Sequence, residues 1–304
     1  MISKLTKNFG LILSRFLPGW SSSRIDAALY SPAANEREIR VPRGFSEFEL
    51  KSKDGVINGY KIGKGPVVVF VHGWGGGAYQ FFALMKGLSR CGFTAIAFDH
   101  QGHGKSRVQQ ADLHQFITTT NFVLHHVKNH NNDGLYSVVG HSTGCIAIAN
   151  ARPAILKDLP LFLISPVFNY RLFFLKKLVK LKLHPDLLKQ YANDFAKVYK
   201  REYGKLELAR NLDKYGDVTV IAHDKSDSET SIAETYRFVQ RYPLTKLLVT
   251  KEFDHERIIN SESVWQELKS HLNYEDTTIN FTRDVLASKT IVTEISQLPG
   301  QKEA

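Results

Sequence analysis

The chain has 304 residues, of which 43% are hydrophobic, and a net charge of +10 at pH 7. That length is enough to bury one large core. The two cysteines, Cys91 and Cys145, exclude a disulfide framework and suit a reducing compartment, so we expect a cytoplasmic protein. No stretch of the sequence is long and apolar enough to span a bilayer.

The first 17 residues place apolar side chains at helical spacing, with Lys4, Lys7 and Arg15 between them. We expect an amphipathic helix at the start of an N-terminal arm that covers residues 1–44. Two interpretations stay open. The helix packs on the protein's own core, or it lies on an anionic membrane surface.

Residues 45–64 predict two antiparallel strands around the turn at Asp54-Gly55. The apolar, mostly β-branched run at 66–71 predicts a strand buried on both faces. A glycine-rich stretch follows it, then a helical pattern at 79–90 and a second buried strand at 94–98. Alternation of strand and helix predicts parallel strands with right-handed crossovers.

The next apolar run, residues 136–139, leads into Gly140-His141-Ser142-Thr143-Gly144. This is a G-x-S-x-G pentapeptide followed by small, apolar residues that suit a helix. A sharp strand-to-helix turn exposes the serine hydroxyl, and glycines two residues before and after it remove Cβ atoms that would collide there. The motif predicts that Ser142 is a nucleophile.

Three segments carry a resemblance to a known family: His72-Gly73-Trp74, residues 99–106 with the pattern D-x-x-G-H-G-x-S, and the pentapeptide at 140–144. The chain resembles α/β-hydrolase fold enzymes of the serine esterase and lipase type. The resemblance implies an α/β fold with a mostly parallel sheet of about eight strands, flanking helices and a helical cap insertion. It also implies a catalytic triad in the chain order serine, acid, histidine.

The acid is expected just after a later strand, which residues 218–222 predict. Enzymes similar to this chain carry an H-G/D-x-x-D turn at this point, and its last aspartate is catalytic. That position is Asp227 here, and Asp224 and Glu229 remain the alternatives.

The histidine is expected after the last strand, at residues 245–249, and His255 follows it. The family usually has glycine before this histidine, where this chain has Asp254. His271 is the only later histidine, and it falls in a predicted amphipathic helix.

The resemblance implies that Ser142 attacks an acyl carbon, His255 moves the proton and Asp227 orients the imidazole. The backbone N–H groups of Trp74 and Thr143 would form the oxyanion hole. No cofactor and no metal are expected, because no cysteine or carboxylate completes a zinc-like spacing with the histidines. A serine nucleophile also argues against the aspartate chemistry of epoxide hydrolases and haloalkane dehalogenases.

The resemblance divides the chain into a core of residues 45–165 and 215–273, a helical cap at 166–214 and a tail at 274–304. Residues 171–214 carry twelve lysines and arginines against five acidic residues. The cap is therefore strongly basic, and with residues 1–17 it would present positive charge to an anionic membrane.

The sequence therefore predicts a serine hydrolase that acts on small carboxylic esters with short or medium acyl groups. Two alternatives remain: a thioesterase for an anionic acyl carrier, attracted by the basic cap, and a catalytically idle ligand-binding protein. Binding to nucleic acid is not expected, because no recognised module accompanies the charge.

Overall fold

A computed structural model describes residues 39–106, 111–157, 159–180, 185–198, 205–206, 208–212 and 219–272. The predicted N-terminal helix and most of the arm, and the tail from residue 274, lie outside these residues. None of the helices that are described combines the length and the apolar character needed to cross a membrane.

One sheet of eight strands forms the centre of the described structure, in the order β1-β2-β4-β3-β5-β6-β7-β8. The first two strands pair antiparallel, β2 joins β4 antiparallel, and every other pairing is parallel. The predicted fold class is confirmed. The strands are β1 (Ser46–Ser52), β2 (Gly55–Ile62), β3 (Val67–Val71), β4 (Thr94–Phe98), β5 (Leu135–His141), β6 (Leu161–Ile164), β7 (Thr219–Asp224) and β8 (Lys246–Thr250).

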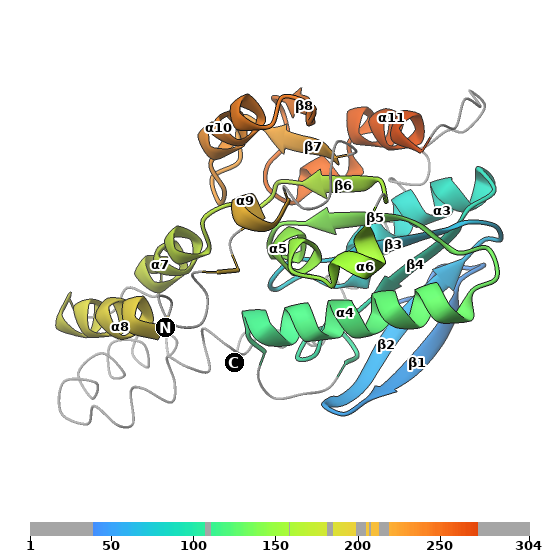
Figure 1. The fold of residues 1–304 in the computed structure, drawn as a ribbon, viewed down its shortest axis with the longest axis horizontal. Coiled ribbons are helices and arrows are strands. Elements are labelled where there is room, and N and C mark those ends of the chain that lie inside the picture. Colours follow the sequence, from blue (N-terminus) through green and yellow to red (C-terminus); the bar gives the residue numbers. More distant parts are fainter. Residues whose placement is uncertain are drawn as a thin grey trace, which may run out of the picture.

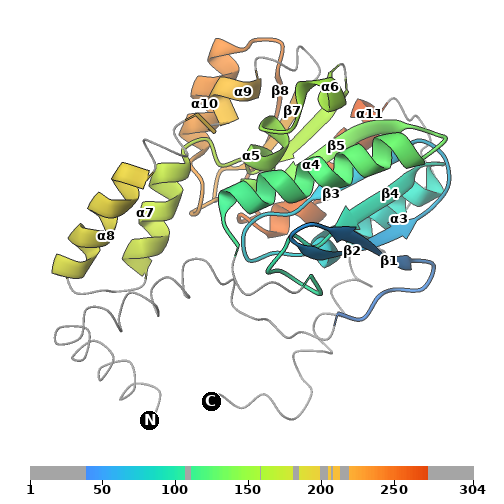
Figure 2. The ribbon, with the colours of Figure 1, turned by 60° about the horizontal axis from the view of Figure 1, so that its bottom comes forward.

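Helices cover both faces of the sheet because its central strands are apolar on both faces (Figures 1 and 2). In β3, Val67, Val69 and Val71 pack with α4 (Leu113–His130), α5 (Thr143–Ala149) and α6 (Pro153–Leu156). Val68 and Phe70 point the other way, because side chains alternate along a strand. They pack with η1 (Ala78–Phe81), α3 (Phe82–Arg90), η4 (Arg257–Asn260) and α11 (Glu262–His271).

Between β6 and β7 the described residues form three further helices: α7 (Tyr170–Lys180), α8 (Pro185–Val198) and α9 (Leu208–Asn211). Figure 1 shows α7 and α8 beyond the sheet edge toward which the arrows of β5 and β6 point, and Figure 2 shows the two helices side by side. The assignment of this segment as a cap stays a prediction. The remaining helix, α10 (Ile232–Arg241), joins β7 to β8.

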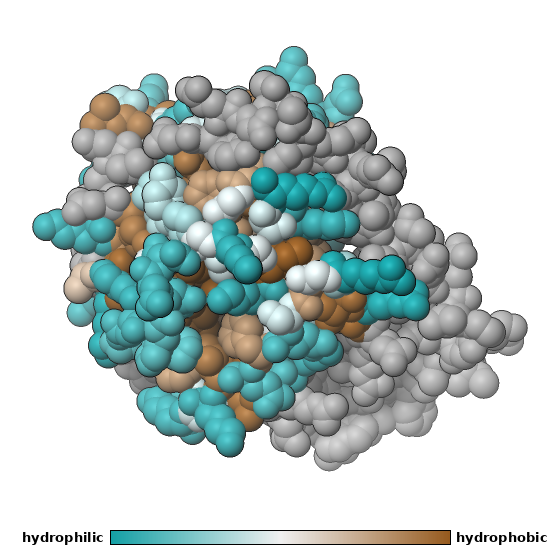
Figure 3. All heavy atoms as spheres, turned by 90° about the vertical axis from the view of Figure 1, so that its right-hand side faces the viewer, coloured by the Kyte–Doolittle hydropathy of each residue, from teal (hydrophilic) through white to brown (hydrophobic). Residues whose placement is uncertain are grey.

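The parallel strands end at one edge of the sheet, which is where ligands bind in open α/β sheets. The loops after β3, β5, β7 and β8 carry Trp74, Ser142, Asp227 and His255, respectively. At the side of the molecule away from α7 and α8, hydrophilic side chains are interspersed with apolar ones on the described surface (Figure 3).

Candidate active site

Ser142 occupies a strained turn between β5 and α5, with φ 54° and ψ −122°. Non-glycine residues rarely adopt positive φ, and such strain is concentrated at functional sites. Close packing maintains the turn. A Cβ at Gly140 would lie 2.5 Å from Ile148 Cδ1, and one at Gly144 would lie 2.4 Å from the Val71 carbonyl oxygen. The two glycines of the motif are therefore required sterically.

The loop after β3 approaches the serine closely at Gly73. A Cβ on this residue would be 2.7 Å from Ser142 Cβ and 3.3 Å from Ser142 Oγ. Only glycine fits at this distance, so the glycine of His72-Gly73-Trp74 brings the loop's backbone next to Ser142.

Ser142, His255 and Asp227 form a continuous hydrogen-bonded chain. His255 Nε2 lies 2.8 Å from Ser142 Oγ, and His255 Nδ1 lies 2.8 Å from Asp227 Oδ2. A carboxylate only accepts, so Nδ1 carries the ring proton and Nε2 accepts from the serine hydroxyl. This is the tautomer that a general base needs. The structure thus brings together the three residues predicted as a triad.

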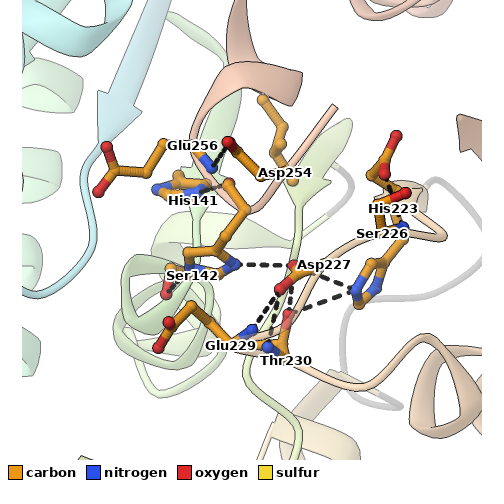
Figure 4. A network of polar contacts seen from close by, with 12 residues as sticks. His141, Ser142, His223, Ser226, Asp227, Glu229, Thr230, Asp254 and Glu256 are labelled. Carbon is orange, nitrogen blue, oxygen red and sulfur yellow. Dashed lines mark hydrogen bonds and ion pairs between the residues drawn. The ribbon is translucent and has the colours of Figure 1, made fainter. Parts of the chain in front are cut away.

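Asp227 is buried and surrounded by donors, as Figure 4 shows. Its Oδ1 accepts from the backbone N–H groups of Glu229 and Thr230 at 2.8 and 2.9 Å. Its Oδ2 accepts from Thr230 Oγ1 at 2.7 Å and faces His223 Nε2 at 3.3 Å. Burial raises the pKa of Asp227, but hydrogen bonds from His223 and His255 more than offset it and hold the pKa well below its usual range. The carboxyl is therefore ionised.

The two alternative acids contact other groups. Asp224 accepts from Thr250 Oγ1 at 2.5 Å and from the N–H of Phe253 at 3.0 Å. It therefore links the acid loop to the loop that carries His255. The carboxylate of Glu229 pairs with Lys180 of α7. Of the three candidates, the structure places only Asp227 against the imidazole.

Two histidines to which the sequence assigned no function contact residues of the predicted triad. His141 is buried and its Nε2–H donates to the carbonyl oxygen of His255 at 2.8 Å. Burial, followed by the nearby His255, lowers the pKa of His141 to about 3, so it is neutral at physiological pH. The buried His223 faces Asp227 from the other side and contacts Thr235 Oγ1 at 2.6 Å. The sequence signal that could have identified them is position, because His141 directly precedes Ser142 and His223 lies four residues before Asp227.

Asp254 occupies the position where the family usually has glycine. Its Oδ1 accepts from the backbone N–H groups of Glu256 and Arg257 at 3.1 and 2.8 Å, and its Oδ2 accepts from Arg257 Nε at 2.7 Å. An aspartate that caps its own turn stabilises the turn without a glycine. This explains how the loop can turn before His255 although Asp254 replaces the usual glycine.

The predicted oxyanion donors are adjacent, because the N–H of Trp74 donates to Thr143 Oγ1 at 2.7 Å. Buried histidines hold this loop. His103 Nε2 accepts from the N–H of Gly75 at 3.0 Å, and burial lowers the pKa of His103 to about 4, so it is a neutral acceptor. His72 Nε2 accepts from the N–H of His100 at 2.9 Å and joins the loop to the turn after β4.

Aromatic rings line the area beside these donors. The Trp74 indole is half-buried and stacks on Phe116, with ring centroids 5.5 Å apart. Phe173 of α7 is buried, and Lys177 Nζ lies 4.9 Å from the ring centroids of both Trp74 and Phe173. The helix α7 therefore directly contacts the loop after β3 that carries the predicted oxyanion donor Trp74.

Comparison with known proteins agrees with this architecture. Residues 66–151 match the family model of the alpha/beta hydrolase fold. An esterase from Pyrococcus furiosus superimposes with a TM-score of 0.58 at 18% identity, over 75% of this chain and 90% of its own. The protein has the α/β-hydrolase fold. No curated protein matches the chain.

Two further solved structures show how varied the proteins with this architecture are. The thioesterase domain from the curacin biosynthetic pathway superimposes with a TM-score of 0.52 at 15% identity, over 75% of this chain and 99% of its own. A membrane phospholipase A described as a bacterial virulence factor superimposes with a TM-score of 0.56 at 17% identity, over 90% of this chain and 98% of its own. At such identities the likeness defines the fold and not the substrate.

Proposed function

We propose that this protein is a serine hydrolase that cleaves carboxylic esters with short or medium acyl groups through an acyl-enzyme intermediate. The observation that carries the proposal is the chain of 2.8 Å contacts from Ser142 Oγ to His255 and from His255 to Asp227. A strained turn that presents the serine and an ionised, buried acid behind the imidazole complete the arrangement.

In this mechanism Ser142 Oγ attacks the ester carbonyl carbon while His255 Nε2 takes the hydroxyl proton. The imidazolium is stabilised by the Asp227 carboxylate. His255 then gives the proton to the leaving alcohol as the C–O bond breaks, which leaves the acyl group on Ser142. Water, deprotonated by His255, attacks the acyl-enzyme and releases the carboxylic acid and free Ser142.

The negative oxygen formed at each attack would accept hydrogen bonds from the backbone N–H groups of Thr143 and Trp74. In the structure the Trp74 N–H donates to the Thr143 hydroxyl at 2.7 Å, so this donor must share that bond with the substrate oxygen or turn from it to the substrate oxygen. Because the hydroxyl accepts there, its own proton is available for the substrate oxygen. We propose that Thr143 contributes its side chain as well as its amide to the oxyanion hole.

The test is hydrolysis of p-nitrophenyl esters of increasing chain length by the wild type and by Ser142→Ala, with circular dichroism to show that the variant is folded. We expect turnover in the wild type and its loss in the variant. The chain-length series then gives the size of the acyl pocket. Wild-type turnover by folded Ser142→Ala would overturn the assignment of the nucleophile.

A thioesterase of the same fold is the second candidate, and the twelve basic residues at 171–214 favour it. Positive charge attracts an anionic acyl carrier such as coenzyme A. Activity on an acyl-coenzyme A that falls steeply with salt, beside salt-independent activity on a neutral ester, would support this candidate. The remaining alternative is a catalytically idle ligand-binding protein. A fluorophosphonate probe distinguishes it from an enzyme, because the probe would leave Ser142 of an idle protein unlabelled.

We propose a cytoplasmic protein that makes peripheral contact with anionic membrane through residues 1–17 and the basic cap segment. Residues 1–17 lie outside the described structure, so charge and spacing alone support this proposal. Full-length protein should sediment with vesicles that contain phosphatidylserine and not with neutral vesicles. Equal sedimentation with both would contradict the proposal.

A further inference from the structure

Lys177 differs from its neighbours on α7 in what its ammonium contacts. Lys176 Nζ donates to the carbonyl oxygen of Glu229 at 3.1 Å, and Lys180 pairs with the carboxylate of the same residue. Lys177 instead lies over the Trp74 and Phe173 rings, 4.9 Å from each centroid. Within the residues that the structure describes, its ammonium has no carboxylate at ion-pair distance.

The surroundings of this ammonium are largely apolar. Phe173 is 8% exposed, and Trp74 in turn stacks on the buried Phe116. Burial lowers the pKa of Lys177 to about 7, although the nearest acid, Glu229, acts in the opposite direction. The faces of the two aromatic rings attract the cation through their quadrupoles. They supply no acceptor for its N–H groups, so its hydrogen-bonding capacity is left for a ligand.

The location connects Lys177 to the reacting atoms. Its ammonium covers the indole of Trp74, and the amide of Trp74 is bonded to Thr143, the residue after Ser142. An ammonium that is half-desolvated and lacks an acid partner binds an anion more strongly than one in water, because charge-assisted hydrogen bonds strengthen as the dielectric falls. A carboxylate on the substrate would supply the missing acceptor.

We propose that Lys177 is a specificity-determining residue that binds a carboxylate on the substrate, so that the preferred substrates are esters carrying a free carboxylate on the acyl chain or on the leaving group. This inference rests on the proposed esterase function. The competing explanation is that Lys177 has only a structural, fastening role, in which its contacts with the two rings hold α7 against the loop that carries Trp74.

The experiment compares esters that differ in one carboxylate. Mono-p-nitrophenyl adipate and p-nitrophenyl hexanoate share a six-carbon acyl chain and differ at its far end. The pair 4-(hexanoyloxy)benzoate and its methyl ester places the carboxylate on the leaving group instead. Values of kcat/KM are measured for wild type, Lys177→Met and Lys177→Arg. Arg171→Met, which removes an exposed positive charge from the same helix, is the matched control.

We expect the wild type to prefer the carboxylate-bearing ester in one of the two pairs. The ratio of kcat/KM values within that pair should fall by about tenfold in Lys177→Met, the size of one lost charge-assisted hydrogen bond. Lys177→Arg should retain part of the preference, and Arg171→Met should retain all of it. Equal losses on both members of each pair, or no preference in the wild type, would overturn the proposal in favour of the fastening role.

A binding measurement separates this proposal from the proposed function. Calorimetric titration of Ser142→Ala needs no turnover, and it compares monomethyl adipate with methyl hexanoate and 4-(hexanoyloxy)benzoate with its methyl ester. If the wild type hydrolyses none of the esters, the esterase proposal fails. Tighter binding of the carboxylate-bearing ester in either pair that disappears in Ser142→Ala/Lys177→Met would then still support an anion site. Equal binding within both pairs by both proteins would overturn it.

Discussion

The turn that carries Ser142 and the loop that carries Asp227 are held in place by different means. Glycine packing shapes the first: added Cβ atoms at Gly73, Gly140 and Gly144 would lie between 2.4 and 2.7 Å from neighbouring atoms. Hydrogen bonds shape the second, where Asp227 accepts from two backbone amides, a threonine and two histidines. The turn at Ser142 should therefore be sensitive to added side-chain volume, and the loop at Asp227 to changes of charge and hydrogen-bonding capacity.

The largest effect is expected from Asp227→Asn, which keeps the shape of the acid and removes its charge. Without the carboxylate, His255 loses both the acceptor that fixes its tautomer and the charge that stabilises its cation. The kcat on p-nitrophenyl esters should fall by about a thousandfold or more. Glu229→Gln is the control, because the carboxylate of Glu229 pairs with Lys180 rather than with the imidazole. Equal losses would mean that Asp227 has no special role.

Gly144→Ala tests the steric side of the comparison. Its Cβ would lie 2.4 and 2.6 Å from the carbonyl oxygens of Val71 and His72, so either the elbow or β3 must shift. We expect kcat/KM to fall by about a hundredfold, because small displacements of a nucleophile are costly. The free energy of unfolding should fall by about 3 kcal/mol in urea titrations.

Gly134→Ala is the matched control for that substitution. Gly134 has φ +73° but no atom within 4 Å of an added Cβ, so the change introduces backbone strain without collision. It should cost about 1 kcal/mol of stability and leave activity unaltered. If the two alanine variants behaved alike, packing would not be what maintains the elbow.

Thr143→Val should have a smaller effect, because it removes one hydroxyl from a site that keeps both backbone donors. We expect kcat to fall by about tenfold while KM changes little, since the hydroxyl acts on the oxyanion formed at the transition state. Thr143→Ser restores a hydroxyl and should recover most of the loss. A loss in Thr143→Ser as large as that in Thr143→Val would assign the effect to packing instead.

The smallest effect concerns stability against pH. The pKa of Asp227 is lower in the folded protein than the value of about 3.9 expected on unfolding. Its carboxylate therefore stabilises the fold above that value, and the contribution is lost as pH falls through the folded pKa. In denaturant titrations the wild type should exceed Asp227→Asn in stability near neutrality. This difference should shrink below about pH 4, and a difference independent of pH would refute the assignment.

Much of this protein was predictable from local sequence. The runs at residues 66–71 and 95–98 are apolar at every position, which is how strands buried on both faces differ from surface strands. The pentapeptide at 140–144 predicted the elbow from its pattern alone, although the atoms that require glycine at Gly144 belong to Val71 and His72, far away in the sequence. The predicted helix at 79–90 begins with the 3-10 turn η1 (Ala78–Phe81) before α3, a difference confined to its first turn.

The sequence by itself determined the fold class and proposed Ser142 and His255, because strand periodicity and the elbow depend on neighbouring residues. Only the tertiary structure decided which acid reaches the imidazole, since Asp224, Asp227 and Glu229 lie within six residues and point to different partners. The tertiary structure alone showed the hydrogen bond between Trp74 and Thr143. It also placed Lys177 over the ring of Trp74, which lies about a hundred residues earlier in the chain. Contacts between distant segments depend on how the layers pack, and no local pattern encodes them.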